Sequence, residues 1–179
     1  MKIRIGLLVI LSLMLIAGCS TRTSHQSALS TVLNELNDKQ MIAKAEVKDG
    51  IVIFMKDDRN NLHSGLVFGP SYSTYCGGGS LSLTENSQIS SMYNDCNDAD
   101  GKKSNYVSLF TGTLNNDVIN SLEIKYRAGK KEYKQKAEIL KTKDGMRVWF
   151  VKPEKTKKDH LTLNSITGYS DEGKVIYSQ

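Results

Sequence analysis

Between residues 45 and 177, apolar and polar residues alternate in short runs, with turn residues about every 8–12 positions. Successive side chains of a strand point to opposite faces of a sheet, so a period of two predicts half-buried strands. The pattern predicts a mainly β (α+β) chain that folds as an antiparallel β-sandwich or a partly closed barrel. The expected strands are residues 45–48, 51–56, 62–68, 80–84, 88–93, 106–111, 122–127, 132–139, 146–152, 161–169 and 174–177.

Tight turns mark the hairpins of this pattern. Asp49-Gly50 separates two strands, and this dipeptide favours the positive φ of a two-residue turn. Ala128-Gly129 joins the most regular hairpin, in which apolar residues alternate with charged ones on both sides. Residues 94–103 are expected to form a long turn, and a soft subdomain boundary is expected near residues 100–104.

One segment has a helical period instead. Leu29, Val32, Leu33 and Leu36 recur at the i, i+3, i+4 and i+7 spacing that forms one apolar stripe on a helix. This predicts one N-terminal amphipathic helix over residues 27–39. Its polar face lacks a Lys/Arg cluster of the kind that binds membranes, which favours packing of the stripe on a sheet.

The first residues have the layout of an export signal. Lys2 and Arg4 precede an apolar run over residues 5–17, and the small residues Ala17 and Gly18 follow. The run is shorter than the ~20 apolar residues of a spanning helix. We therefore interpret residues 1–18 as a signal peptide.

The end of this leader, Leu15-Ile16-Ala17-Gly18-Cys19, resembles the lipobox of bacterial lipoprotein precursors. The resemblance covers only the leader, and Ile16 occupies a position where that family usually has Leu. It implies that Cys19 receives lipid, including fatty acids such as palmitate, and becomes the N-terminus after cleavage. Residues 19–26 would then tether a single domain, residues 27–179, to the extracytoplasmic face of the cell membrane, or to the outer membrane of a two-membrane cell.

Two cysteines remain, Cys76 and Cys96. In an oxidising compartment an isolated pair is most simply a disulfide, here closing a loop of about 20 residues. Two free thiols or a metal pair are the alternatives, although no Cys-x-x-Cys spacing favours metal.

The distribution of charge along the chain bears on which partners it could bind. The net charge of +5 includes Lys2 and Arg4, so cleavage of the leader leaves +3. Residues 123–158 hold thirteen Lys or Arg and five acidic residues. This stretch either binds anionic wall polymers or lipid headgroups, or is a solvated outer face of a sheet. Export argues against nucleic acid as a partner.

Candidate chemistry is sparse. His25, His63 and His160 are far apart and are expected at surfaces or turns, and we assign no catalytic residue and no cofactor. An EF-hand alignment around Gly101 fails, because Cys96 and Val107 would occupy two ligand positions. An irregular calcium site at Asp95, Asp98 and Asp100 is the alternative to a simple turn.

The middle of the chain contains an aromatic, glycine-rich stretch. It forms either a binding loop or a cover for the disulfide, and its residues are Tyr72, Tyr75, Gly77, Gly78 and Gly79. With the anchor, it favours a non-catalytic binding module for an unknown protein or other partner, with an inhibitor or immunity protein as one form. The alternatives are an envelope hydrolase that uses two carboxylates and a structural envelope protein.

Overall fold

The computed structural model of the chain describes residues 34, 39–68, 74–84, 87–97, 105–154, 156–157 and 160–179. In these ranges the chain is almost entirely strand, and all strand pairs are antiparallel. The strands form three sheets, which we name A, B and C. The prediction of a mainly β, antiparallel chain is confirmed.

Sheet A is built from consecutive hairpins. Its order is β1 (Lys39–Val47), β2 (Gly50–Asp57), β3 (Asn61–Phe68) and β4 (Thr74–Gly77), and β5 (Leu81–Ser82) also pairs with β3. Because each strand pairs with the next one along the chain, sheet A is a meander in which β1 is an edge strand.

Sheet B lies in the middle. Its order is β10 (Glu138–Lys141), β11 (Arg147–Val151), β7 (Asn105–Leu114) and β12 (Thr156–Lys157), and β6 (Ile89–Asn97) also pairs with β7. Every residue from 107 to 114 is buried, on both faces of β7. A strand buried on both faces must have a layer on each side, which explains the nearly continuous apolar run of β11.

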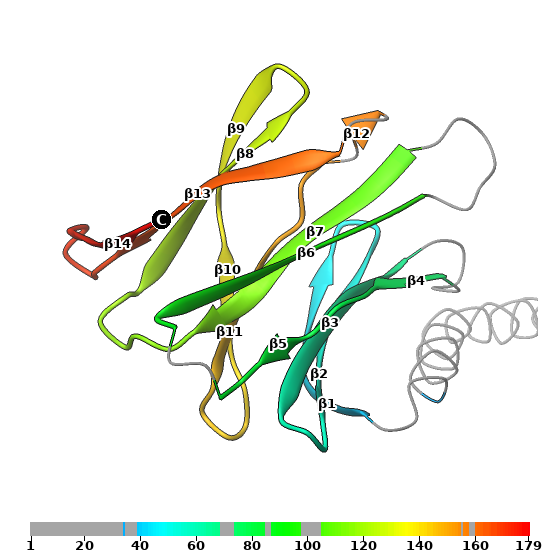
Figure 1. Cartoon of the computed structure of the whole chain (residues 1–179), viewed down its shortest axis with the longest axis horizontal. Coiled ribbons are helices and arrows are strands. Elements are labelled where there is room, and N and C mark those ends of the chain that lie inside the picture. The colour runs from blue at the N-terminus through cyan, green and yellow to red at the C-terminus, as the bar shows by residue number, and fades with distance from the viewer. Residues whose placement is uncertain are drawn as a thin grey trace, which may run out of the picture.

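Sheet C covers the other side of sheet B. Its order is β14 (Val175–Ser178), β13 (Leu161–Tyr169), β8 (Ser121–Ala128) and β9 (Lys131–Lys136). Figure 1 shows sheet A on one side of the long strand β7 and sheet C on the other. The chain crosses from sheet C to sheet B at Ala137, between β9 and β10.

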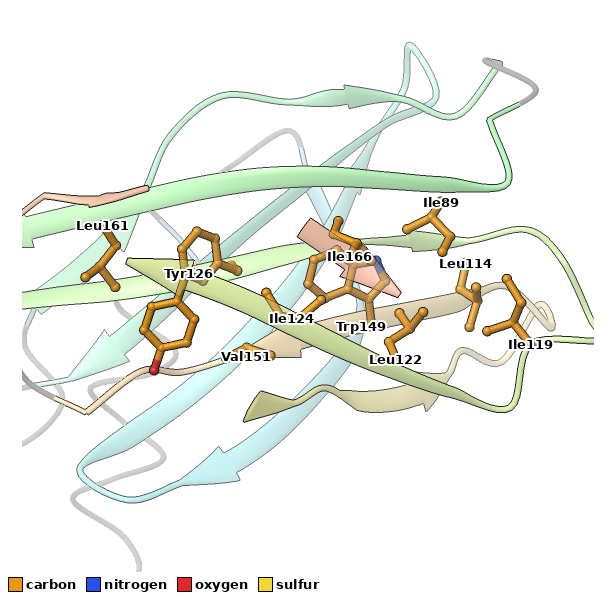
Figure 2. Packing of buried hydrophobic residues seen from close by; sticks show 11 residues of the cluster. Ile89, Leu114, Ile119, Leu122, Ile124, Tyr126, Trp149, Val151, Leu161 and Ile166 are labelled. Carbon is orange, nitrogen blue, oxygen red and sulfur yellow. The ribbon is translucent and has the colours of Figure 1, made fainter. Parts of the chain in front are cut away.

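Two hydrophobic clusters hold the three layers together. The cluster between sheets A and B is formed by Val52, Phe54, Leu62, Leu66, Phe68, Cys76, Val107, Leu109, Val148 and Phe150. The cluster between sheets B and C is formed by Ile89, Phe110, Leu114, Ile119, Leu122, Ile124, Tyr126, Trp149, Val151, Leu161 and Ile166. Figure 2 shows the Trp149 ring in this second cluster, near Ile124, Leu122 and Ile166.

Trp149 depends on a glycine opposite it. Its buried indole Nε1 donates hydrogen bonds to the carbonyl oxygens of Ser90 and Thr113, both at 3.2 Å. Gly112 is its cross-strand partner on β7. A Cβ atom at Gly112 would overlap the Ser90 carbonyl oxygen and lie 2.7 Å from Nε1. Only glycine therefore lets β6, β7 and the indole approach one another.

Several details differ from the sequence predictions. Across the described strands, none of the three sheets closes into a barrel. The first hairpin turns at Lys48-Asp49, where Asp49 has a φ of 67°, and Gly50 already pairs with Val47. Residues 94–97 belong to β6 rather than to a turn, because they pair with residues 106–109 on β7.

The expected helix over residues 27–39 lies mostly outside the described residues. Within it, Asn34 is helical and exposed, while Lys39 opens β1. The expected subdomain boundary at residues 100–104 also lies outside the described residues.

Candidate functional site

The predicted binding loop is partly strand. Tyr75 and Gly77 belong to β4, Gly78 and Gly79 follow it and are exposed, and Tyr72 lies outside the described residues. The Tyr75 ring lies where side chains at Gly65 and Gly77 would otherwise project, because a Cβ atom at either glycine would overlap the phenol. Burial of this half-covered ring raises the pKa of its hydroxyl.

These residues line a shallow hollow of about 460 Å³ on sheet A. Besides Tyr75 and the three glycines, its lining residues are Lys39, His63 and Ser80. His63 pairs across the sheet with Met55, so its ring lies beside the end of β2. The hollow therefore combines an aromatic wall, exposed glycine backbone and an imidazole.

His63 is held by Asp57, at the last position of β2. The His63 Nε2 atom lies 2.9 Å from a carboxylate oxygen of Asp57, and the two side chains are 19% and 11% exposed. The carboxylate also accepts hydrogen bonds from the Arg59 and Asn61 amides and from the Asn61 side chain. The His63 hydrogen bond, followed by those of Asn61, holds the Asp57 pKa well below its usual range. Asp57 thus orients His63, whose Nδ1 lies on the opposite edge of the ring.

A second hollow, of about 630 Å³, lies between the turn of the β1–β2 hairpin and the segments around β9–β10 and after β11. It has polar walls and an apolar floor that includes the buried Phe150, Val151 and Pro153. The polar lining residues come from distant parts of the chain: Glu46, Lys48, Asp49, Gln135, Lys136, Glu138, Lys152 and Glu154. We refer to this hollow as the inter-sheet cleft.

The carboxylates of the inter-sheet cleft are solvated. Glu46, Asp49, Glu138 and Glu154 are all exposed, and no acidic residue is buried in the part of the chain that the structure describes. A glycosidase needs a general acid whose pKa burial has raised. The described acidic residues do not provide this arrangement.

The two remaining cysteines meet between sheets A and B. The Cys76 and Cys96 sulfurs lie 2.04 Å apart and their Cα atoms 5.7 Å apart, which suits a disulfide. Cys76 on β4 is buried, so the bond would join β4 to β6 within the core.

Of the three calcium candidates, the structure describes only Asp95. Asp95 lies 2.7 Å from the His160 Nδ1 atom, and the ring of Tyr106 packs against that imidazole. Asp98 and Asp100 lie outside the described residues. Among the residues that are described, no three His, Cys, Asp or Glu side chains cluster as metal ligands.

The part of the basic stretch that lies on sheet C, residues 123–136, is interleaved with acids on the outer face of that sheet. Lys134 lies 2.7 Å from Glu123, and the Glu123 hydrogen bond raises the Lys134 pKa. Glu132 pairs with Arg127 across the hairpin and accepts a hydrogen bond from Asn164. These acids divide the basic charge of the face into smaller areas.

The Asp57–His63 pair and the inter-sheet cleft were not predicted from the sequence. Asp57 and His63 flank a turn and could have been found by pairing β2 with β3. The cleft had no comparable signal, because its walls come from three sheets.

No protein family, curated protein or solved structure matches the chain. The lipobox and Cys19 lie outside the described residues. Among the residues that are described, no helix is long and apolar enough to cross a membrane.

Proposed function

We propose that this protein is a lipid-anchored, extracytoplasmic binding protein. The leader pattern and the lipobox support removal of residues 1–18 and attachment of lipid to Cys19. The Cys76–Cys96 geometry is consistent with an oxidising compartment, where such a bond would persist. The domain, beginning with an amphipathic helix over residues 27–39, would lie on the outer face of the cell membrane, or on the outer membrane where there are two.

The observation that carries a binding role is the position of the inter-sheet cleft between two edge strands. Glu46 and Val47 belong to β1, the edge strand of sheet A, and Glu138 belongs to β10, the edge strand of sheet B. An edge strand presents backbone N–H and C=O groups that an extended peptide can pair with. The solvated carboxylates of the cleft favour this role over acid–base hydrolysis.

The ligand that fits is an extended polypeptide carrying both positive and negative side chains. Lys48 and Lys136 line the cleft together with acids such as Glu138, so a ligand of one charge sign meets repulsion. The apolar floor at Phe150 and Pro153 suits an occasional aliphatic side chain. The peptide would belong to a protein partner or to the peptide part of a wall polymer.

The test is binding of fluorescent peptides to the full-length protein in non-ionic detergent. A panel of octapeptides that alternate Lys, Glu and Val is compared with the same peptides carrying Pro at alternate positions, and with polyphosphate. We expect the unmodified peptides to bind, and Pro to abolish binding because it removes backbone donors.

Matched charge reversals locate the site. Lys136→Glu, in the cleft, is expected to weaken peptide binding by roughly tenfold. Lys125→Glu, on the exposed outer face of sheet C, is expected to leave it unchanged. If no peptide binds, the peptide role is wrong. If polyphosphate binds instead, and both variants weaken it equally, the basic outer face is the binding surface.

The anchor is tested separately. Cells grown with labelled palmitate should label the wild-type protein but not Cys19→Ala, and the mass of the wild-type protein should lack residues 1–18. An unlabelled wild-type protein would overturn the anchor without affecting the peptide experiment.

A further inference from the structure

Another hollow borders the edge strand β1, at the end opposite to the inter-sheet cleft. It has a volume of about 440 Å³. Its walls come from the start of β1, from the end of β2 with the turn after it, and from the turn between β10 and β11. Its lining includes Met41, Ile42, Lys56, Asp58, Lys143 and Asp144. We call it the far hollow.

The far hollow and the inter-sheet cleft lie between the same two edge strands. Met41 and Val47 belong to opposite ends of β1, and they line the far hollow and the cleft respectively. Glu138 at the start of β10 lines the cleft, while Lys143, just after β10, lines the far hollow. The two hollows are therefore the two ends of one side of the stack formed by sheets A and B.

The strip between the two hollows is apolar and low. Ala43 and Ala45 on β1 and Leu140 on β10 are half-buried and pack against the cluster between sheets A and B. An alanine side chain is a single methyl group, so neither alanine blocks an extended chain beside β1. Among the described strands β1 pairs only with β2, so its other edge presents backbone N–H and C=O groups between Met41 and Val47.

A β-bulge gives the far hollow its apolar wall. Met41 pairs with Met55 and Ala43 pairs with Phe54, so Ile42 is an extra residue on β1. Consecutive strand residues normally point to opposite faces, whereas the bulge lets both Met41 and Ile42 line the far hollow. Met41 is 37% exposed, so its side chain offers apolar surface to a ligand.

Charges of both signs surround this wall. Lys143 and Asp144 on one side and Asp58 on the other are exposed. The pKa of Asp144 is lowered mainly by the Thr142 hydrogen bond and to a smaller extent by the charge of Lys56. A ligand of one charge sign therefore meets repulsion here, as it does in the inter-sheet cleft.

We propose that the far hollow is a second subsite of the peptide site, and that one extended peptide runs along β1 from the inter-sheet cleft to the far hollow. This inference rests on the proposed peptide-binding function. Six strand steps from Met41 to Val47 cover about 20 Å, so the ligand needs seven or eight residues to reach both hollows. The peptide lies antiparallel to β1, which is the slightly more stable pairing, and places an aliphatic side chain near its C-terminus against Met41.

A series of fluorescent peptides tests the length, with the full-length protein in non-ionic detergent. Every peptide begins with Lys-Glu-Lys-Glu, the octapeptide adds four residues that end in Leu, and the decapeptide adds two more after Leu. We expect the octapeptide to bind at least tenfold more tightly than the tetrapeptide, and the decapeptide to gain less than twofold. Equal affinities across the series would overturn the second subsite.

Two exposed apolar residues provide a matched pair of variants. Met41→Asp places a charge in the wall of the far hollow, while Val118→Asp places the same charge on the turn between β7 and β8, where Val118 is 57% exposed. We expect Met41→Asp to weaken octapeptide binding by roughly tenfold and to leave tetrapeptide binding within twofold of the wild type. Val118→Asp should leave both unchanged. Equal effects of the two variants on the octapeptide would overturn the proposal.

Crosslinking locates the two ends of the bound octapeptide. Benzophenone-alanine in place of the C-terminal Leu should attach to protein fragments that contain Met41, and the same group at the first position should attach within residues 135–138 or 150–153. Attachment of both ends within the cleft would overturn the second subsite, and exchanged ends would overturn the antiparallel orientation.

The proposed function and this inference fail in different ways. If Lys136→Glu weakens peptides of every length equally, and neither length nor Met41→Asp matters, the cleft binds peptide and the second subsite is wrong. If no peptide of any length binds, both are wrong. A protein that sediments as a dimer, and that Met41→Asp converts to a monomer, would assign the strip beside β1 to a second copy and overturn the proposal.

Discussion

Replacing Gly112 by Ala should destabilise this protein far more than the same change elsewhere. The added methyl group would overlap the Ser90 carbonyl oxygen and lie 2.7 Å from the indole nitrogen of Trp149. Both neighbours are fixed, because Ser90 pairs with Thr113 in the sheet and Trp149 is fully buried. Gly78→Ala is the matched control, since its Cβ would meet only Asn94 Oδ1, at 3.8 Å.

The size of this loss of stability depends on which groups must shift to make room for the methyl group. Overpacking a rigid core costs about 1–3 kcal/mol. If β6 shifts to make room, the two indole hydrogen bonds of Trp149 are also weakened, at roughly 0.5–1.5 kcal/mol each. A total of about 4 kcal/mol is expected, which lowers Tm by roughly 8–16 °C in a domain of this size. Gly78→Ala should change Tm by less than about 2 °C.

Thermal unfolding followed by circular dichroism, with urea titration as a second probe, measures both variants against the wild type. Equal Tm values for Gly112→Ala and Gly78→Ala would refute the close approach of β6 to β7 at Trp149. A large loss in Gly78→Ala would show instead that the Gly77–Gly79 backbone is constrained in ways that its open surroundings do not explain.

Three further predictions concern stability. Replacing Cys76 and Cys96 together by Ala should lower the free energy of unfolding by about 3 kcal/mol, measured in urea, because a loop of about 20 residues is no longer closed; no change would mean that the thiols are unpaired. The pKa of Asp57 is lower in the folded protein than in the unfolded chain. Its contribution to folding stability is therefore complete above pH ~4 and is lost as the pH falls further. Asp57→Asn should therefore reduce stability at pH 7 and flatten the acid limb of a Tm-against-pH curve, and parallel curves would contradict this. Thr111→Val should lower the free energy of unfolding by about 1–3 kcal/mol, because it leaves the buried hydroxyl of Ser64 without its partner at 2.6 Å. Adding Ser64→Ala should recover part of this loss, and no recovery would mean that the two hydroxyls do not form a hydrogen bond.

The sequence was sufficient for most of the strands. A period of two identified β8 and β13 almost to their ends, because each has one buried and one more exposed face. The apolar run of β3 was also located, although both faces of that strand are largely buried. The sequence was misleading at residues 94–97, where Asn and Asp suggested a turn. Pairing with β7 overrode that preference, since strand propensity depends on neighbouring strands.

The candidate site was less accessible to sequence reasoning. Tyr75 and the adjacent glycines, which the sequence predicted as a binding loop or a cover for the disulfide, line one hollow. The position of the Tyr75 ring over Gly65 depends on β3–β4 pairing. The inter-sheet cleft joins residues about 100 positions apart in the chain. No local pattern records which distant segments become neighbours.

Some properties are therefore local and others are not. The chain alone predicted a strand-rich domain, and it supplied two hypotheses: an export leader that ends at a lipobox-like Cys19, and a disulfide between the two remaining cysteines. Only the tertiary structure decided that three sheets stack with β7 in the middle, that Gly50 is a packing residue rather than a turn residue, and that the outward face of sheet A is covered. The reason is physical: periodicity records which face of a strand is buried, whereas the partner that buries it is chosen by contacts between segments far apart in sequence.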